Sequence, residues 1–239
     1  MAEEKQQIIE TQPCKQNAEE FPNSSLNLTA HNDILVHQLL DVVEVIFAWS
    51  RISRYQILDA DDNQLLYVYE VADCYGRQCF SGLREFKLKI TVDDNVLYSV
   101  YRPKRCTSRC CFMCCQLQQL DILNSTGAQI ASVHEKWSCL KPIFHINDKD
   151  NELLYIIEGS SCHCRLGSDI KFQVLTTSGE VISTITRIWS GCRDCIGAVD
   201  DFKINFNEGL TNEERWLILC ASFLIDANYF QKHSRLCWW

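Results

Sequence analysis

The middle of the chain holds a cluster of thiols that is too dense for ordinary core packing. Four of the six residues from 110 to 115 are cysteines, Cys110, Cys111, Cys114 and Cys115, and two large apolar residues separate the two pairs. Crowded thiols suit three chemistries: metal ligation, disulfide formation, and acylation by fatty acids at a membrane surface. Four basic residues precede the cluster and form a patch that can approach an anionic membrane: Arg102, Lys104, Arg105 and Arg109.

The beginning of the chain argues against the disulfide alternative. Residues 1–7 contain no basic segment followed by an apolar one, so we expect no secretory signal peptide. The chain is then expected to stay in the reducing cytosol, where disulfides are rare. The 15 cysteines are also odd in number and unevenly spaced, unlike a secreted disulfide framework.

Zinc ligation is the main alternative to acylation. Cys111 and Cys114 have the CxxC spacing of zinc sites. Further thiolates for such a site are available in the second half of the chain: Cys162, Cys164, Cys192 and Cys195. Zinc sites usually use separate ligand pairs, however, and adjacent doublets make a tetrahedral arrangement awkward. The sequence therefore favours acylation over zinc.

Charge and motif content argue against two other classes of function, nucleic-acid binding and catalysis. A net charge of -8 argues against a nucleic-acid partner, because such binding needs clustered Lys and Arg. No hydrolytic or redox motif is present, and the histidines are scattered along the chain: His31, His37, His134, His145, His163 and His233. A catalytic Cys–His dyad could still assemble in space, but the sequence gives no means of choosing one.

Short apolar runs, many of them alternating with polar residues, dominate the sequence from Arg54 onward and predict β-strands separated by turns. The clearest runs are residues 65–71, 86–92, 96–101, 117–122, 153–157, 172–175 and 181–188. Residues 62–70 recur at 150–158 with six of nine positions identical, and a weaker repeat relates residues 127–138 to 179–190. We interpret these repeats as a duplicated β-meander, which would close into a barrel or pack as a sandwich.

One convincing helix is predicted near the C-terminal end. Asn212 can cap it, and two acidic residues follow in the first turn, where the helix dipole favours them. The stretch from Trp216 to Ile225 is apolar on every face, yet it is only ten residues long, whereas a membrane span needs about 20. We therefore expect a helix threaded through a barrel rather than a transmembrane anchor.

Several tracts, in their order and spacing, resemble the phospholipid scramblase family over nearly the whole folded part. The tracts are Arg102-Pro103 before the cysteine cluster, His134 to Pro142, Trp189-Ser190-Gly191, Asp201-Phe202 and Ala221 to Asp226. The resemblance implies a mainly β, Tubby-like fold: a closed twelve-stranded barrel from a duplicated meander around a hydrophobic C-terminal helix. We expect a flexible leader at 1–30, the barrel at 31–230 with its helix at about 212–230, and a tail at 231–239.

The resemblance also implies a function. It implies palmitate on Cys110, Cys111, Cys114 and Cys115, residence at the cytosolic face of the plasma membrane, and calcium-activated movement of phospholipids between leaflets. The alternative is an acyl-anchored Tubby-like module that binds lipid headgroups or proteins without transporting anything. SH3 and WW partners are not expected, since residues 1–30 contain only Pro13 and Pro22.

The family's calcium loop maps onto residues 198–209, and the candidate metal ligands that we name there are Asp200 and Asp201. Of these, Asp200 alone occupies a ligand position of the loop; Asp201, Asn205, Asn207 and Glu208 lie nearby. A calcium loop needs oxygen ligands at regular positions, several of which are apolar here. Phe202, Ile204 and Phe206 alternate as in a half-buried strand. We therefore expect calcium binding at this segment to be weak or absent.

Overall fold

Twelve short strands make up most of the chain that the structure describes. The computed structural model describes residues 26–39, 53–71, 85–93, 95–105, 117–160, 169–188 and 201–230. The strands are β1 (Asp33–Leu39), β2 (Arg54–Leu58), β3 (Gln64–Val71), β4 (Phe86–Val92), β5 (Asn95–Arg102), β6 (Gln119–Asn124), β7 (Gln129–Lys136), β8 (Ile143–Asp148), β9 (Leu153–Gly159), β10 (Ile170–Thr176), β11 (Val181–Arg187) and β12 (Phe202–Phe206). The helical elements are η1 (Leu28–Ala30), α4 (Asn212–Ile225) and the π-helical turn η4 (Asp226–Phe230).

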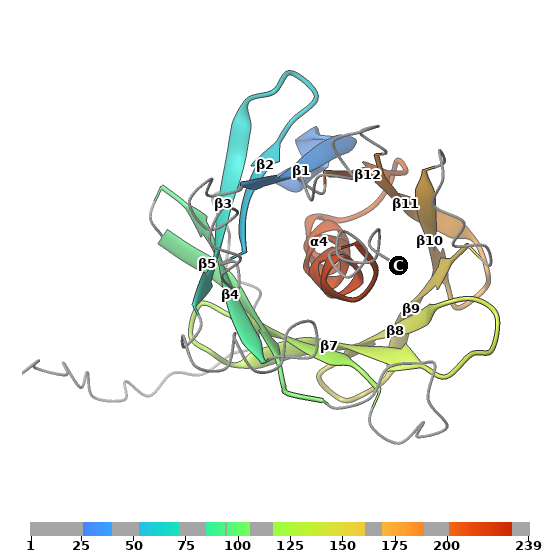
Figure 1. Cartoon of the computed structure of the whole chain (residues 1–239). Coiled ribbons are helices and arrows are strands. Elements are labelled where there is room, and N and C mark those ends of the chain that lie inside the picture. Colours follow the sequence, from blue (N-terminus) through green and yellow to red (C-terminus); the bar gives the residue numbers. More distant parts are fainter. Residues whose placement is uncertain are drawn as a thin grey trace, which may run out of the picture.

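Alternation along the strands decides which side chains face the interior, because successive residues of a strand point to opposite faces. In β12, Phe202, Ile204 and Phe206 are buried, whereas Lys203 and Asn205 are partly exposed. Each strand pairs antiparallel with the next, and β1 pairs with β12, so the sheet closes around α4 (Figure 1). Closure leaves no strand edge open to other chains. The predicted fold, a closed twelve-stranded barrel with a C-terminal helix inside, is confirmed.

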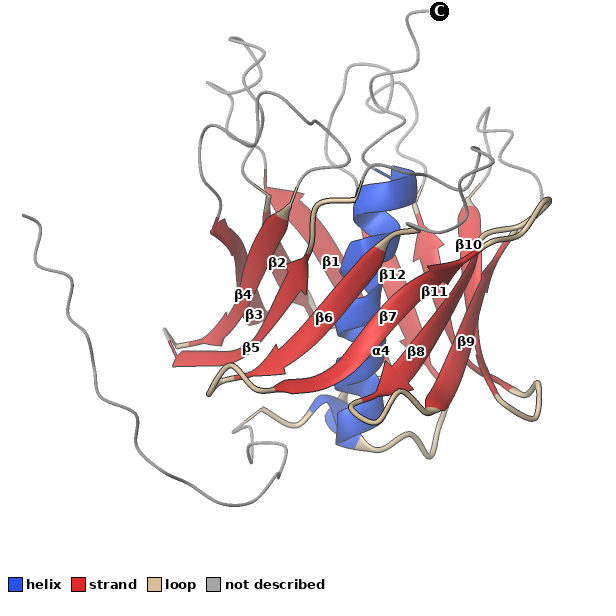
Figure 2. Cartoon of the chain, turned by 90° about the horizontal axis from the view of Figure 1, so that it is seen from below, coloured by secondary structure: helices blue, strands red, loops and turns tan. Residues whose placement is uncertain are grey.

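The barrel has two different ends, which we call the turn end and the loop end. Even-numbered strands run toward the turn end, where short turns such as 59–63 and 148–152 lead into the next strand. Odd-numbered strands run toward the loop end, where longer connections begin. The chain leaves β12 at the turn end, and α4 then runs through the barrel toward the loop end (Figure 2).

Four of the turns at the turn end are built in the same way. In the β2–β3 turn, the Asp59 carboxylate accepts hydrogen bonds from the backbone N–H groups of Asp61 and Asn63, and Asp62 has a φ of 62°. A positive φ favours Gly, Asn and Asp. The matching pairs in the other three turns are Asn124 and Gly127, Asp148 and Asn151, and Thr176 and Gly179.

These turns correct the register of the stronger internal repeat. The sequence match pairs Asp62 with Asp150, but the structural equivalent of Asp62 is Asn151, since both have a positive φ at the same turn position. A shift of one residue moves every side chain to the opposite face of a strand. Accordingly, Glu70 is buried inside the barrel, whereas its sequence counterpart Glu158 is partly exposed and pairs with Lys141. The two strands that carry the repeat, β3 and β9, nevertheless lie six strands apart, which is half of the twelve-stranded ring.

The start of the helix also differs from the prediction. Thr211, not Asn212, is the N-cap, because its hydroxyl accepts from the Glu214 N–H while the Glu214 carboxylate accepts from the Thr211 N–H. The Asn212 side chain instead accepts a hydrogen bond of 2.9 Å from the N–H of Leu28. Residues 28–30, predicted to belong to a flexible leader, therefore form η1 against the helix, with Leu28 fully buried.

Helix α4 supplies the centre of the hydrophobic core. Every side chain from Arg215 to Ile225 is buried. Aromatic contacts join it to the wall: the Trp216 ring centroid lies 4.7 Å from that of Tyr98, and that of Phe223 lies 5.3 Å from that of Tyr55. Within the ranges described above, no helix combines the length and apolar character that crossing a bilayer requires.

Candidate functional site

The predicted acylation sites lie outside the described residues, as do Arg109 and Asp200. The strands on either side of the cysteine cluster are described, however. β5 ends at Arg102 and β6 begins at Gln119, both at the loop end of the barrel. The prediction that Cys110, Cys111, Cys114 and Cys115 carry palmitate therefore concerns the chain that connects these two strand ends.

The predicted membrane-facing basic patch is wrong for Arg102. Tyr98, Val100 and Arg102 alternate along β5, so Arg102 takes the inward phase and its side chain is only 1% exposed. Its guanidinium donates to Gln118 Oε1, at 3.0 Å from Nε, and to Asn228 Oδ1, at 2.9 Å from Nη2. It also lies 5.4 Å from the centre of the Phe86 ring.

The described remainder of that patch is smaller than predicted. Lys104 is exposed, and Arg105 is half-buried with its guanidinium donating to the Gln119 side chain. Both residues follow β5 at the loop end. Lys104 and Arg105 therefore form a positively charged surface next to the cysteine segment, whereas Arg102 makes its contacts inside the barrel.

A ring of buried polar side chains, which the sequence analysis missed, lines the barrel near the loop end. The last inward residue of each odd-numbered strand is polar or charged in five of six strands: Gln38, Glu70, Arg102, Glu135 and Arg187. The sixth is Gly159 on β9. One feature of the sequence could have revealed this ring: in each of these strands a polar or charged residue follows, two positions further along, the apolar residues that face the interior.

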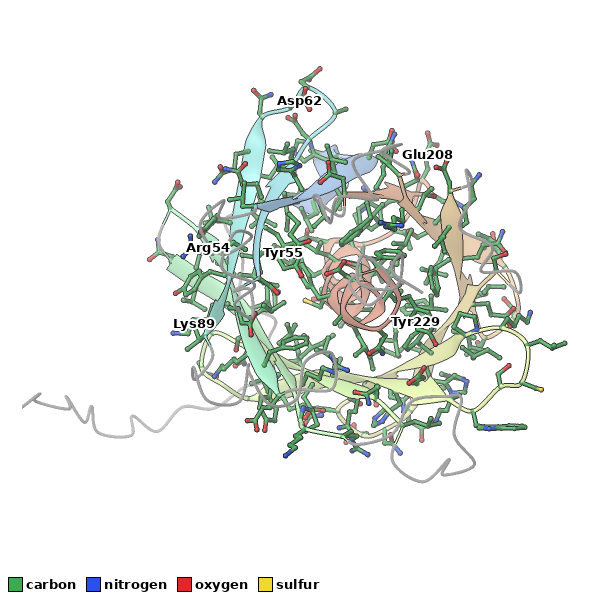
Figure 3. All side chains as sticks on the ribbon, in the orientation of Figure 1. Arg54, Tyr55, Asp62, Lys89, Glu208 and Tyr229 are labelled. Carbon is green, nitrogen blue, oxygen red and sulfur yellow. The ribbon has the colours of Figure 1, made fainter. Side chains whose placement is uncertain are left out.

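This ring holds the end of the central helix by hydrogen bonds. The Asn228 amide oxygen accepts from Arg102, and the Tyr229 hydroxyl donates to Glu135 Oε1 at 2.8 Å. The Tyr55 hydroxyl donates to Asp226 Oδ2 at 2.7 Å, so Tyr55 points from the barrel wall toward the helix, whereas Tyr229 belongs to η4 and points from the helix toward the wall (Figure 3). Burial, together with the Asp226 carboxylate, raises the pKa of Tyr55 well above its ordinary value, so the phenol remains a neutral donor.

The opposite end of the helix is fixed by a buried arginine. Arg215 donates to the backbone oxygens of Leu28, at 3.2 Å, and His31, at 2.7 Å, and lies 5.0 Å from the Phe206 ring centre. The Tyr155 hydroxyl donates to the Glu214 carboxylate in the first helical turn. Polar contacts at both ends and apolar packing between them keep the helix inside the barrel.

The described part of the calcium segment does not offer a set of metal ligands. The Asp201 carboxylate oxygen lies 2.8 Å from His37 Nδ1, and the following residues form β12, as the alternating pattern predicted. On the outer face of β12, the Lys203 ammonium pairs with Asp33 Oδ2 at 3.0 Å. In the part of the chain that the structure describes, no three His, Cys, Asp or Glu side chains gather as a metal site.

Comparison with known proteins identifies the family. A family model described as Scramblase matches residues 12–232. Phospholipid scramblase 1 of Rattus norvegicus is 32% identical over 208 residues, which cover 86% of this chain and 62% of the rat protein. Phospholipid scramblase 2 of Bos taurus is 31% identical over 206 residues, covering 85% of this chain and 70% of that protein.

A third relative matches in the same way. Phospholipid scramblase 4 of Homo sapiens is 29% identical over 204 residues, which cover 84% of this chain and 62% of the human protein. The chain thus spans 62% of the length of the rat and of this human relative. Because the family model covers most of the chain, the chain belongs to the scramblase family.

Proposed function

We propose that this protein is a membrane-associated phospholipid scramblase. Membership of the scramblase family across residues 12–232 is the observation that carries this proposal. Its substrates would be membrane phospholipids, which move between leaflets without any covalent bond being made or broken. The protein would thus be a lipid transporter rather than an enzyme.

Reconstitution into liposomes tests transport. In vesicles with a fluorescent lipid in both leaflets, external dithionite bleaches only the outer leaflet unless lipids exchange. The proposal expects bleaching to proceed past half of the label when the purified protein is present, and protein-free vesicles serve as the control. Bleaching that stops at half in both samples contradicts scrambling.

Anchoring at the cytosolic face of the plasma membrane is proposed to use palmitate on the cysteine cluster. A single acyl chain holds a protein only marginally, whereas several anchor it stably. The neighbouring Lys104 and Arg105 support this placement, because basic side chains beside acyl chains are attracted to anionic lipid.

Acyl-exchange labelling tests the anchor. A variant with Ala at Cys110, Cys111, Cys114 and Cys115 is expected to lose labelling and to shift in part from the membrane fraction to the soluble fraction. Cys139→Ala is the matched control, because Cys139 is an exposed thiol outside the cluster. If the fourfold variant labels and fractionates like the control, the anchor is elsewhere. Zinc in the purified protein, lost in the fourfold variant, would favour the metal alternative.

A second candidate function is an acyl-anchored binding module that recognises lipid headgroups or proteins without transport. The enclosed helix favours this second candidate, because the apolar side chains of α4 are buried inside the barrel and do not contact lipid. The same liposome experiment separates the two candidates, because a binding module associates with vesicles but leaves the inner-leaflet label protected. For calcium, the poor ligand set at Asp201 leads us to propose that activity is insensitive to calcium chelation.

A further inference from the structure

The large apolar side chains that the structure leaves exposed lie at one end of the barrel. Among the described residues these are Val71, Trp137, Leu140 and Ile188, with exposed fractions of 46%, 58%, 74% and 40%. Val71 ends β3, Trp137 and Leu140 lie in the connection from β7 to β8, and Ile188 follows β11. All four positions belong to the loop end.

The spacing of these residues around the ring is regular. β3, β7 and β11 are four strands apart in a closed ring of twelve, so the apolar residues mark three points at equal intervals around the barrel mouth. Three separated points define a plane across the mouth. A protein partner usually binds to one contiguous apolar patch. Separated points on a rim suit a flat surface better.

Charge distinguishes the two ends of the barrel. The turn end, including the connection into α4, is strongly acidic in its described residues: Asp59, Asp61, Asp62, Asp93, Asp148, Asp150, Glu152, Glu180, Glu208 and Glu213. Lys149 is the single Lys or Arg in the described parts of these turns. Asp62 and Glu208 can be seen there, at the rim of the barrel in Figure 3.

The loop end carries the opposite charge where the apolar residues are largest. From the end of β5 to the start of β8 it presents Lys104, Arg105, Lys136 and Lys141, of which Lys141 pairs with Glu158. The described acidic residues that are at least partly exposed at this end are Glu85, Glu158, Asp169 and Asp201. Glu158 is the partner of Lys141, and the other three lie on other strand ends. An anionic surface would therefore attract the side that bears Trp137 and Leu140 and repel the turn end.

The β7–β8 connection is fixed at its base. The Gly159 N–H donates to the Pro142 oxygen at 2.9 Å, and Pro142 is buried. A Cβ atom at Gly159 would lie 2.4 Å from Pro142 Cγ, so the two residues pack as closely as a glycine allows. The connection thus presents Trp137 and Leu140 from a rigid base, and tryptophan is favoured at the headgroup level of bilayers.

We propose that the loop end of the barrel docks flat on an anionic phospholipid bilayer, with Trp137 and Leu140 inserted among the headgroups. The barrel axis then stands along the membrane normal, and the acidic turn end faces away. The inference rests on the proposed membrane association and adds to it a specific surface and orientation. It needs no acyl chain, so it can be tested on protein that carries none.

Vesicle co-sedimentation of unacylated full-length protein tests the apolar contact. The vesicles contain phosphatidylcholine with or without phosphatidylserine. Trp137→Ser combined with Leu140→Ser is expected to lower the partition coefficient by roughly tenfold or more, because two apolar side chains leave the bilayer. Trp137→Phe, which keeps an apolar ring, is the control and should retain most of the binding.

A matched pair of charge variants tests the orientation. Lys104→Gln and Lys149→Gln remove the same charge from exposed side chains at opposite ends of the barrel. With phosphatidylserine present, Lys104→Gln is expected to weaken binding about fivefold, as for one basic residue near an anionic surface, while Lys149→Gln changes little.

Several outcomes would overturn the proposal. The first is that the wild-type protein does not bind vesicles of either composition. The second is that the double serine variant binds as tightly as the wild type. The third is that the two lysine variants weaken binding equally. None of these outcomes decides whether the protein scrambles lipids, which the dithionite assay measures separately. Loss of scrambling with intact, oriented docking would instead favour the binding-module alternative.

Discussion

Replacing Arg102 by alanine should strongly destabilise the barrel. The change removes the donors to two buried amide oxygens, on Gln118 and Asn228, and each lost partner costs about 1–3 kcal/mol. Loss of the guanidinium above the Phe86 ring adds about 0.5–2 kcal/mol. Added together, these ranges span about 2.5–8 kcal/mol. We expect a reduction of the free energy of unfolding in the lower part of that span, about 3–5 kcal/mol, as for removing one partner of a buried ion pair.

Thermal unfolding followed by far-ultraviolet circular dichroism measures this effect. For a domain of this size a loss of about 3 kcal/mol lowers the Tm by roughly 6–12 °C. Lys104→Ala is the matched control, because Lys104 is exposed two residues further along, and its loss should change stability by no more than about 0.5 kcal/mol. Equal melting of the two variants would show that Arg102 does not serve the interior, and the reasoning about the polar ring would fail.

Three further predictions concern other described residues. Asp201→Asn should leave any calcium response unchanged, as measured by the Tm with calcium or chelator, because the Asp201 carboxylate faces His37 rather than a ligand set. Burial lowers the pKa of His134, so its NMR titration should have a midpoint below 6.5. Because the folded state binds this proton less readily than the unfolded state, the free energy of unfolding should fall as the pH drops below 6.5. Gly159→Ala should cost about 1–3 kcal/mol in chemical denaturation, because its Cβ atom would overlap the Pro142 ring; an unchanged midpoint would show that the β7–β8 connection yields easily.

The architecture could be inferred from local patterns, and the register only in part. The alternation of Phe202, Ile204 and Phe206 correctly predicted a strand, and the short apolar run in α4 correctly predicted an enclosed helix. The repeat at 62–70 and 150–158 was misaligned by one residue, because similar amphipathic strands give many identities in either phase. The true register is fixed by the positive φ of Asp62 and Asn151. This is a property of the backbone, which a comparison of residue identities does not detect.

The interior polar ring was hidden for a different reason. Arg102 contacts Asn228, 126 residues away in sequence, and Tyr55 contacts Asp226, 171 residues away. Nothing local in the sequence connects such partners, so Arg102 was grouped with the basic residues beside it. Its phase relative to Tyr98 and Val100 was the available clue. The acylation of Cys110 and its neighbours stays a prediction, since those residues lie outside the described ranges.

The position of α4 at the end of the chain has a consequence for biosynthesis. The helix that fills the barrel is synthesised after all twelve strands, and β1 must wait for β12 before the ring can close. Until then, the emerging strands carry an apolar face that has nothing to pack against, which is the condition under which nascent chains aggregate or recruit chaperones. Folding of this domain should therefore be completed only once the chain through Phe230 has left the ribosome.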